Sequence, residues 1–64
     1  ELTFSDLVDD VRRSQAAVLV ADERLSLVNV ALLLGFAEQS SFTRAFRRWY
    51  GMAPGEYRRR QPAE

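Results

Sequence analysis

The first third of the chain places apolar residues at the spacing of an amphipathic helix. The apolar set consists of Phe4, Leu7, Val8, Val11, Val18 and Leu19, with a polar gap at Ser14 and Gln15. Thr3 and Asp6 have the T-x-x-D spacing of a capping box, which marks a helix start. We therefore expect a helix from about Phe4 to Val20 that ends near Ala21.

A shorter and more apolar segment follows, with the sequence LSLVNVALLLG. Ser26 has the residue type of an N-cap, and Gly35 has that of a left-handed helix terminator. These signals predict a helix from about Leu27 to Leu34, in which Asn29 stands where a glutamate would complete a capping box. Because apolar residues occupy most of its positions, this helix is expected to be buried on most sides.

A third helix is expected from Gln39 or Ser40 to Gly51, after the turn GFAEQS. At about 100° per residue, its residues divide into two separate sides. The apolar stripe consists of Phe42, Ala45, Phe46 and Trp49, and the polar stripe opposite it of Ser40, Thr43, Arg44 and Arg47. Burial contributes about 1.5–3 kcal/mol for each large apolar side chain, so we expect the aromatic residues to form core.

The chain closes with the segment PGEYRRR and the polar tail QPAE. Pro54 suits the first turn of a last short helix. Phe36 and Tyr57 are expected to join the core. No strand pattern or internal repeat is found in the sequence. The predicted fold class is therefore all-α: a small helical domain with a long N-terminal helix, a helix-turn-helix and a short C-terminal helix.

The polar stripe of the third helix indicates a binding function. It carries serine, threonine and arginine, with Arg48 beside it and no acidic residue from Gln39 to Gly51. A solvated helix face usually mixes both charges at i, i+4 spacing, whereas small hydroxyl residues followed by arginines suit the major groove of DNA. A solvated face and a protein-binding face remain alternatives. The short helix before it favours the groove, because a helix-turn-helix places its second helix there and its first across the phosphates.

Charge is divided unevenly, although the 64 residues sum to zero net charge. Residues 1–38 hold seven acidic residues and three arginines, which gives −4, and residues 39–64 hold six arginines and two glutamates, which gives +4. All nine basic residues are arginine. The arginine fork suits phosphate and guanine, although a compositional habit of the source genome explains the missing lysine equally well.

The missing residue types argue against an enzyme. The chain has no cysteine and no histidine, and so lacks the commonest general base and metal ligand. We expect no catalytic residue, metal or cofactor. Asp9 and Asp10 diverge by about 100° on a helix and favour its dipole rather than forming a reactive pair. No apolar run approaches the ~20 residues that span a bilayer, and no signal-peptide pattern begins the chain, so a soluble cytoplasmic protein is expected.

Residues 31–58, ALLLGFAEQSSFTRAFRRWYGMAPGEYR, resemble the C-terminal signature of the AraC/XylS family of bacterial transcriptional regulators. The matching positions are Ala31, Gly35, Phe36, Ser41, Phe42, Arg44, Phe46, Arg47, Gly51, Pro54, Tyr57 and Arg58. The segment TFSDLVDDVR is similar to the helix that links two helix-turn-helix subdomains in that family. Ala53 and Asn29 depart from the pattern, where the family commonly has serine or threonine and glutamate; the alanine removes a cap worth about 1 kcal/mol.

The resemblance implies sequence-specific binding of double-stranded DNA for transcriptional regulation, in the nucleoid of a bacterial cytoplasm. It divides the chain into a linker helix (1–22), a helix-turn-helix subdomain (23–60) and a tail (61–64). A first helix-turn-helix subdomain and an effector domain are implied as missing partners. The implied base-reading residues are Gln39, Ser40, Thr43 and Arg44, on a recognition helix of about residues 39–50, and the phosphate contacts are Ser26, Arg47, Arg48 and Arg58.

Two alternatives remain open at this stage. Arg58, Arg59 and Arg60 either extend the phosphate contacts or end a helix with favourable charge. The acidic side of the first helix instead suits a protein-interaction module that contacts RNA polymerase or a partner domain. Salt separates this module from DNA binding, because phosphate contacts weaken steeply as salt rises. Without a neighbouring subdomain, we expect the isolated chain to associate or to be marginally stable.

Overall fold

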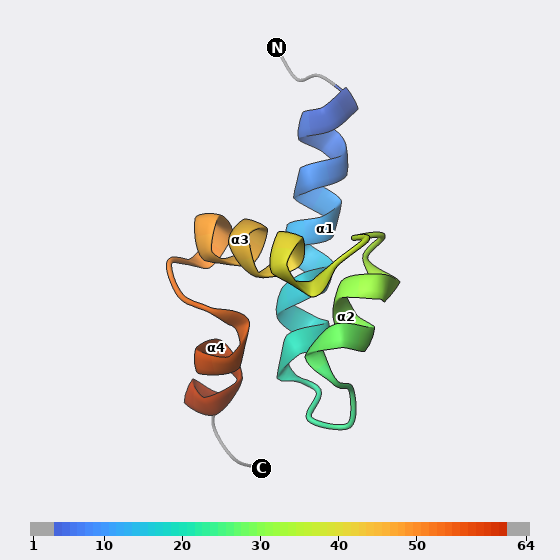
Figure 1. Ribbon diagram of the computed structural model, residues 1–64. Coiled ribbons are helices and arrows are strands. Elements are labelled where there is room, and N and C mark those ends of the chain that lie inside the picture. The colour runs from blue at the N-terminus through green and yellow to red at the C-terminus, as the bar shows by residue number, and fades with distance from the viewer. Residues whose placement is uncertain (1–3, 62–64) are drawn as a thin grey trace.

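The computed structural model describes residues 4–61 and the side chains of residues 7–61. These residues form helices without any strand, so the predicted all-α class is confirmed (Figure 1). The predicted boundaries agree with the observed ones to within about a residue, since the first helix runs one residue further and the second ends one residue earlier than expected. The helices are α1 (Phe4–Ala21), α2 (Leu27–Leu33), α3 (Gln39–Tyr50) and α4 (Pro54–Arg60).

The helix ends follow the local signals in the sequence. Ser26 caps α2, and its Oγ accepts a hydrogen bond from the backbone N–H of Asn29 at 3.1 Å. Gly35 and Gly51 have φ values of 90° and 76°, the left-handed conformation that terminates α2 and α3. Ala53 precedes α4 without any side-chain cap, as its residue type requires. The capping box predicted at Thr3 and Asp6 lies outside the described side chains.

The helices surround one small core. Figure 1 shows α1 as the long axis, with α3 running across it and α2 and α4 beside its C-terminal half. The N-terminal half of α1 projects beyond the other helices. The side chains of the buried core cluster come from α1, α2 and α3 and from Leu34, which follows α2: they are Ala16, Val20, Val30, Ala31, Leu34, Phe42 and Phe46.

Aromatic rings hold α3 and α4 together. Phe42 and Phe46 are fully buried and lie 5.7 Å apart between ring centroids, as expected from their stripe. Phe46 also contacts the ring of Tyr57 of α4 edge-on, at 5.3 Å. Phe36 and Trp49 pack against the same core but are only partly buried. The predicted core role of the aromatic residues is therefore confirmed, with Trp49 at its margin.

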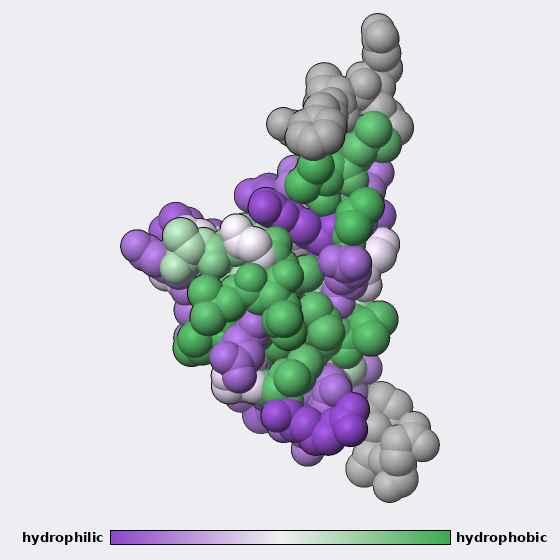
Figure 2. Space-filling view, turned by 90° about the vertical axis from the view of Figure 1, so that its right-hand side faces the viewer, coloured by the Kyte–Doolittle hydropathy of each residue, from purple (hydrophilic) through white to green (hydrophobic). Residues whose placement is uncertain are grey.

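The prediction that α2 is buried on most sides is wrong. Only Val30 and Ala31 of this helix are buried, while Val28, Leu32 and Leu33 are exposed, Leu33 by 64%. Its seven residues, about two turns, contact α1 and α3 on one side, and none of the described residues covers the other. Figure 2, which views the molecule from the side of α2, shows a broad apolar surface there.

Only part of the apolar stripe predicted for α1 joins the core. Leu7, Val11 and Val18 are exposed, Val18 by 71%, whereas Ala16 and Val20 are the residues of α1 that are fully buried. Leu19 of the predicted stripe packs against the core and is partly buried. The other helices of the described part therefore cover only part of the apolar residues of α1.

Candidate nucleic-acid interface

The outer side of α3 carries the side chains predicted to meet DNA. Gln39, Ser40, Arg44, Arg47 and Arg48 are exposed, and Thr43 is half-buried. The opposite side of the helix holds the buried Phe42, Ala45 and Phe46. Because the two sets occupy different sides, the core can anchor α3 without covering the predicted contact residues.

Residues of α1 hold α3 at both of its ends. The guanidinium of Arg12 lies over the ring of Phe36, in the turn before α3, at 4.8 Å from the ring centroid. The φ of 90° at Gly35 forms this turn, and the end of the Arg12 side chain lies beside it. Near the other end of α3, the hydroxyl of Tyr50 donates a hydrogen bond of 2.7 Å to the carbonyl of Arg13. The direction of α3 is thereby tied to that of α1.

The arginines of α3 are not used in ion pairs within the described part of the chain. The ion pairs there join Arg24 to Asp22 and Arg60 to Glu56. The guanidinium of Arg48 lies 6.0 Å from the centroid of the Trp49 ring, within the range of a cation–π contact. Positive charge on this side of α3 therefore stays available to an outside anion.

Glu38 is a polar residue of this region that the sequence reasoning did not assign to the site. It precedes α3 as the N-cap residue, but its side chain makes no capping hydrogen bond. Instead, its Oε1 accepts a hydrogen bond of 3.2 Å from the hydroxyl of Ser40. The residue types that usually cap a helix start are serine, threonine, aspartate and asparagine, so a glutamate here indicates neither a cap nor this bond from sequence.

Ser26 lies at the start of α2 and is exposed. Its Oγ accepts the cap hydrogen bond from Asn29, so its own hydroxyl proton can still be donated outward. The predicted phosphate contact of Ser26 stays a prediction.

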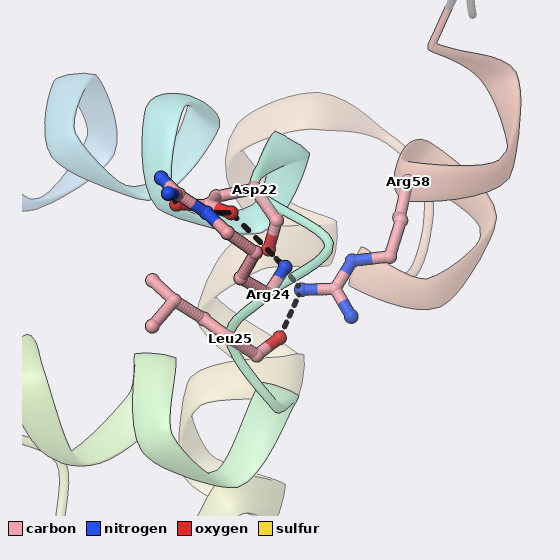
Figure 3. A network of polar contacts seen from close by, with 4 residues as sticks. All are labelled: Asp22, Arg24, Leu25 and Arg58. Carbon is pink, nitrogen blue, oxygen red and sulfur yellow. Dashed lines mark hydrogen bonds and ion pairs between the residues drawn. The ribbon is translucent and has the colours of Figure 1, made fainter.

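Arg58 is engaged inside the molecule (Figure 3). Its Nε donates to the carbonyl of Val20 at 2.8 Å. Its Nη2 donates to the carbonyls of Asp22 and Leu25, at 3.2 and 2.7 Å, as Figure 3 shows. These carbonyls belong to the last turn of α1 and to the turn that leads into α2. These bonds use two of the three nitrogens of the Arg58 guanidinium, and the phosphate contact predicted for Arg58 stays a prediction.

The turn after α1 contains a second polar contact, between Asp22 and Arg24. The carboxylate of Asp22 accepts hydrogen bonds from Nε, Nη2 and the backbone N–H of Arg24 at 2.9–3.0 Å. These bonds, those from the guanidinium above all, lower the pKa of Asp22 from its ordinary value of 3.8 to about 2. The turn is thus closed from both sides, by Arg24 and by Arg58.

The described residues offer no candidate metal site and no membrane-spanning helix. No group of three or more histidine, cysteine, aspartate or glutamate residues there is placed to hold a metal ion. Within the same part of the chain, no helix combines the length and the apolar character needed to cross a membrane.

Comparison with known proteins gives consistent matches. A family model described as a helix-turn-helix domain matches residues 1–60. The chain is similar to the HTH-type transcriptional regulator VirS of Mycobacterium tuberculosis, with 49% identity over 57 residues, which are 89% of this chain and 17% of the relative. It is also similar to the ornithine utilization regulator of Pseudomonas aeruginosa, with 45% identity over 88% of this chain and 16% of the relative.

A solved structure matches as well. The crystal structure of the transcriptional regulator CdpR from Pseudomonas aeruginosa superposes with a TM-score of 0.85 and 42% identity, over 89% of this chain and 18% of that one. The chain thus spans about a sixth of the length of these relatives. The relatives named here are transcriptional regulators rather than enzymes.

Proposed function

Because this chain belongs to the AraC-type helix-turn-helix family of DNA-binding transcriptional regulators, we propose that its α3 enters the major groove of double-stranded DNA. The observation that carries the proposal is the separation of the two sides of α3. The side away from the core is exposed and carries three arginines that form no ion pair within the described residues. A helix of this kind presents donors to a polyanion while its aromatic side keeps it in place.

The roles of the side chains follow from their chemistry. Arg44 suits the O6 and N7 acceptors of guanine, and Gln39 suits the N6 and N7 edge of adenine. Ser40 and Thr43 have small hydroxyl side chains that allow close approach of the helix. Arg47 and Arg48, together with Ser26 of the preceding helix, are assigned to phosphates, which position the protein without reading sequence.

Replacement of two arginines tests these roles. Arg44→Ala is expected to cost roughly 1–3 kcal/mol of binding free energy on the preferred site and to relax the preference at one base pair. Arg48→Ala is expected to weaken all sequences alike, because a phosphate contact carries no sequence information. The measurement is selection from a pool of randomised duplexes, followed by titration of single duplexes at low salt. An Arg44→Ala chain that keeps the full wild-type preference would contradict the assignment.

Salt dependence provides a second measurement on the same proteins. Each phosphate contact contributes about −0.9 to the slope of log affinity against log salt concentration, so Arg48→Ala should reduce the slope by about 1. A helix-turn-helix of this size buries only about 600–1,000 Å² on DNA, so weak binding is expected. A first helix-turn-helix subdomain, an effector domain and RNA polymerase remain predicted partners. An affinity for DNA that is absent even at low salt would favour the protein-interaction alternative.

A further inference from the structure

Glu38 places an acidic group at the start of an otherwise basic helix face. Its backbone is extended, with φ −139° and ψ 151°, as at other N-caps, yet its carboxylate is bonded to no amide of α3. Glu38 and Ser40 are both exposed, and the hydrogen bond of 3.2 Å between them lies outside the core. No ion pair of the described residues includes Glu38. The side chain thus contributes to neither the helix cap nor a charge pair.

The hydrogen bond decides what this end of α3 offers to a partner. A serine hydroxyl has one proton, and here it is donated to Oε1 of Glu38. Oγ of Ser40 is left with acceptor lone pairs, and an ionised carboxylate also only accepts. Glu38 and Ser40, which we term the acceptor pair, therefore present acceptors alone. A serine without this partner would donate or accept and would discriminate little between bases.

The electrostatics of DNA decide which partner suits the acceptor pair. Phosphate oxygens are negatively charged acceptors, and the guanine and thymine edges present O6, N7 and O4 acceptors. All of these repel a carboxylate. In the major groove, the donors are the exocyclic amino groups of cytosine N4 and adenine N6.

On the basis of the proposed function, we propose that the acceptor pair makes Glu38 a specificity-determining residue. It selects a base with an exocyclic amino group, cytosine or adenine, at one position of the DNA site. It rejects guanine and thymine at the same position. Arg44, one turn further along α3, presents only donors and selects the opposite chemistry.

Selection from randomised duplexes tests this proposal with the 64-residue chain and three variants. The wild type is expected to enrich cytosine or adenine at one position, and Glu38→Gln to lose about tenfold of that discrimination, because an amide both donates and accepts. Ser40→Ala is expected to weaken the same position. Glu23→Gln is the matched control: it removes the same charge from an exposed glutamate in the turn between α1 and α2, and should keep the wild-type preference.

Base analogues then separate cytosine from adenine. In the selected duplex, 2-pyrimidinone replaces cytosine, or unsubstituted purine replaces adenine, so that the amino group alone is removed. Wild-type affinity is expected to fall about tenfold with the analogue of the base that is contacted, and that of Glu38→Gln to fall much less. Circular dichroism of each variant shows whether the helix content of the wild type is kept.

The outcomes distinguish this inference from the function on which it rests. A wild-type chain that enriches no motif overturns both. A wild-type motif that Glu38→Gln reproduces in full overturns the role of Glu38 and leaves DNA reading by α3 standing. Loss of preference in Glu38→Gln, together with an unchanged motif in Ser40→Ala, contradicts the acceptor pair, because Glu38 would then act without the serine.

Discussion

Single side chains determine how the turn between α1 and α2 is closed. Asp22 accepts hydrogen bonds from Arg24, and its pKa is lowered to about 2 mainly by the guanidinium bond. Residue types identify such turn contacts only in part. Ser26 could be recognised as a cap from sequence because a cap is local. The hydrogen bond from Ser40 to Glu38 could not, because neither residue type specifies the other as its partner.

Acid should weaken the fold through Asp22. A carboxyl group whose pKa is lower in the folded chain stabilises that state above the ordinary pKa of 3.8, and this stabilisation disappears as pH falls to about 2. The free energy of unfolding is therefore expected to fall between about pH 4 and pH 2. Urea titrations in this range should show a weaker decrease for Asp22→Asn than for the wild type. Equal decreases in both proteins would show that other carboxyl groups account for the effect.

At the level of helices, one side chain joins α4 to the end of α1. Arg58 reaches carbonyls that lie 33–38 residues away in sequence. The positions of the four helices could be predicted, because caps, glycines and the spacing of apolar residues are local signals. The partners of Arg58 could not, since backbone carbonyls carry no sequence signal and their approach to α4 depends on the packed fold.

The link made by Arg58 can be tested with a change that preserves its charge. Arg58→Lys keeps the positive charge but loses the planar fork that serves three carbonyls, so we expect a loss of about 2–3 kcal/mol in the free energy of unfolding. Thermal and urea unfolding measure it. Arg59→Lys, at an exposed position of the same helix, is the control and should change stability by less than about 0.5 kcal/mol.

Arg58→Lys also bears on the predicted contact between Arg58 and a DNA phosphate. If the guanidinium bound DNA, its lysine replacement would retain most of the electrostatic attraction. An unfolding free energy equal to that of the wild type would contradict the structural role of Arg58.

Taken as a whole, the molecule exposes more apolar surface than its sequence pattern predicts. The error in the predicted burial of α2 has a physical cause. The apolar content of a helix shows how much of its surface can be buried, but the number of helices that pack against it decides how much is buried. The aromatic stripe of α3 was predicted correctly because polar residues on the opposite side left only one side for packing. In α2, apolar residues occur all round, and the pattern cannot indicate which side meets the core.

Two adjacent leucines at the end of α2 differ in burial, so replacing each one by alanine compares the buried side of the helix with its exposed side. Leu34 is 5% exposed and belongs to the core, whereas Leu33 is 64% exposed. Leu34→Ala is expected to destabilise the fold by about 2–5 kcal/mol. Leu33→Ala should cost less than about 0.5 kcal/mol. Urea midpoints compare the two, and circular dichroism at low temperature in an osmolyte shows whether Leu34→Ala still folds. Similar losses from both changes would mean that the outer side of α2 is covered in solution.

The contacts of Arg12 and Arg13 give α1 a mechanical role. Arg12 holds the turn before α3, and Arg13 receives the hydrogen bond from Tyr50 near the end of α3. These neighbouring residues lie in the middle of a helix whose N-terminal half projects beyond the rest of the molecule (Figure 1). An α-helix transmits bending and torsion along its length. Because Ala16 and Val20 of the same helix belong to the core that holds α3, a force on the projecting half would reach α3 both through these two contacts and through the core itself.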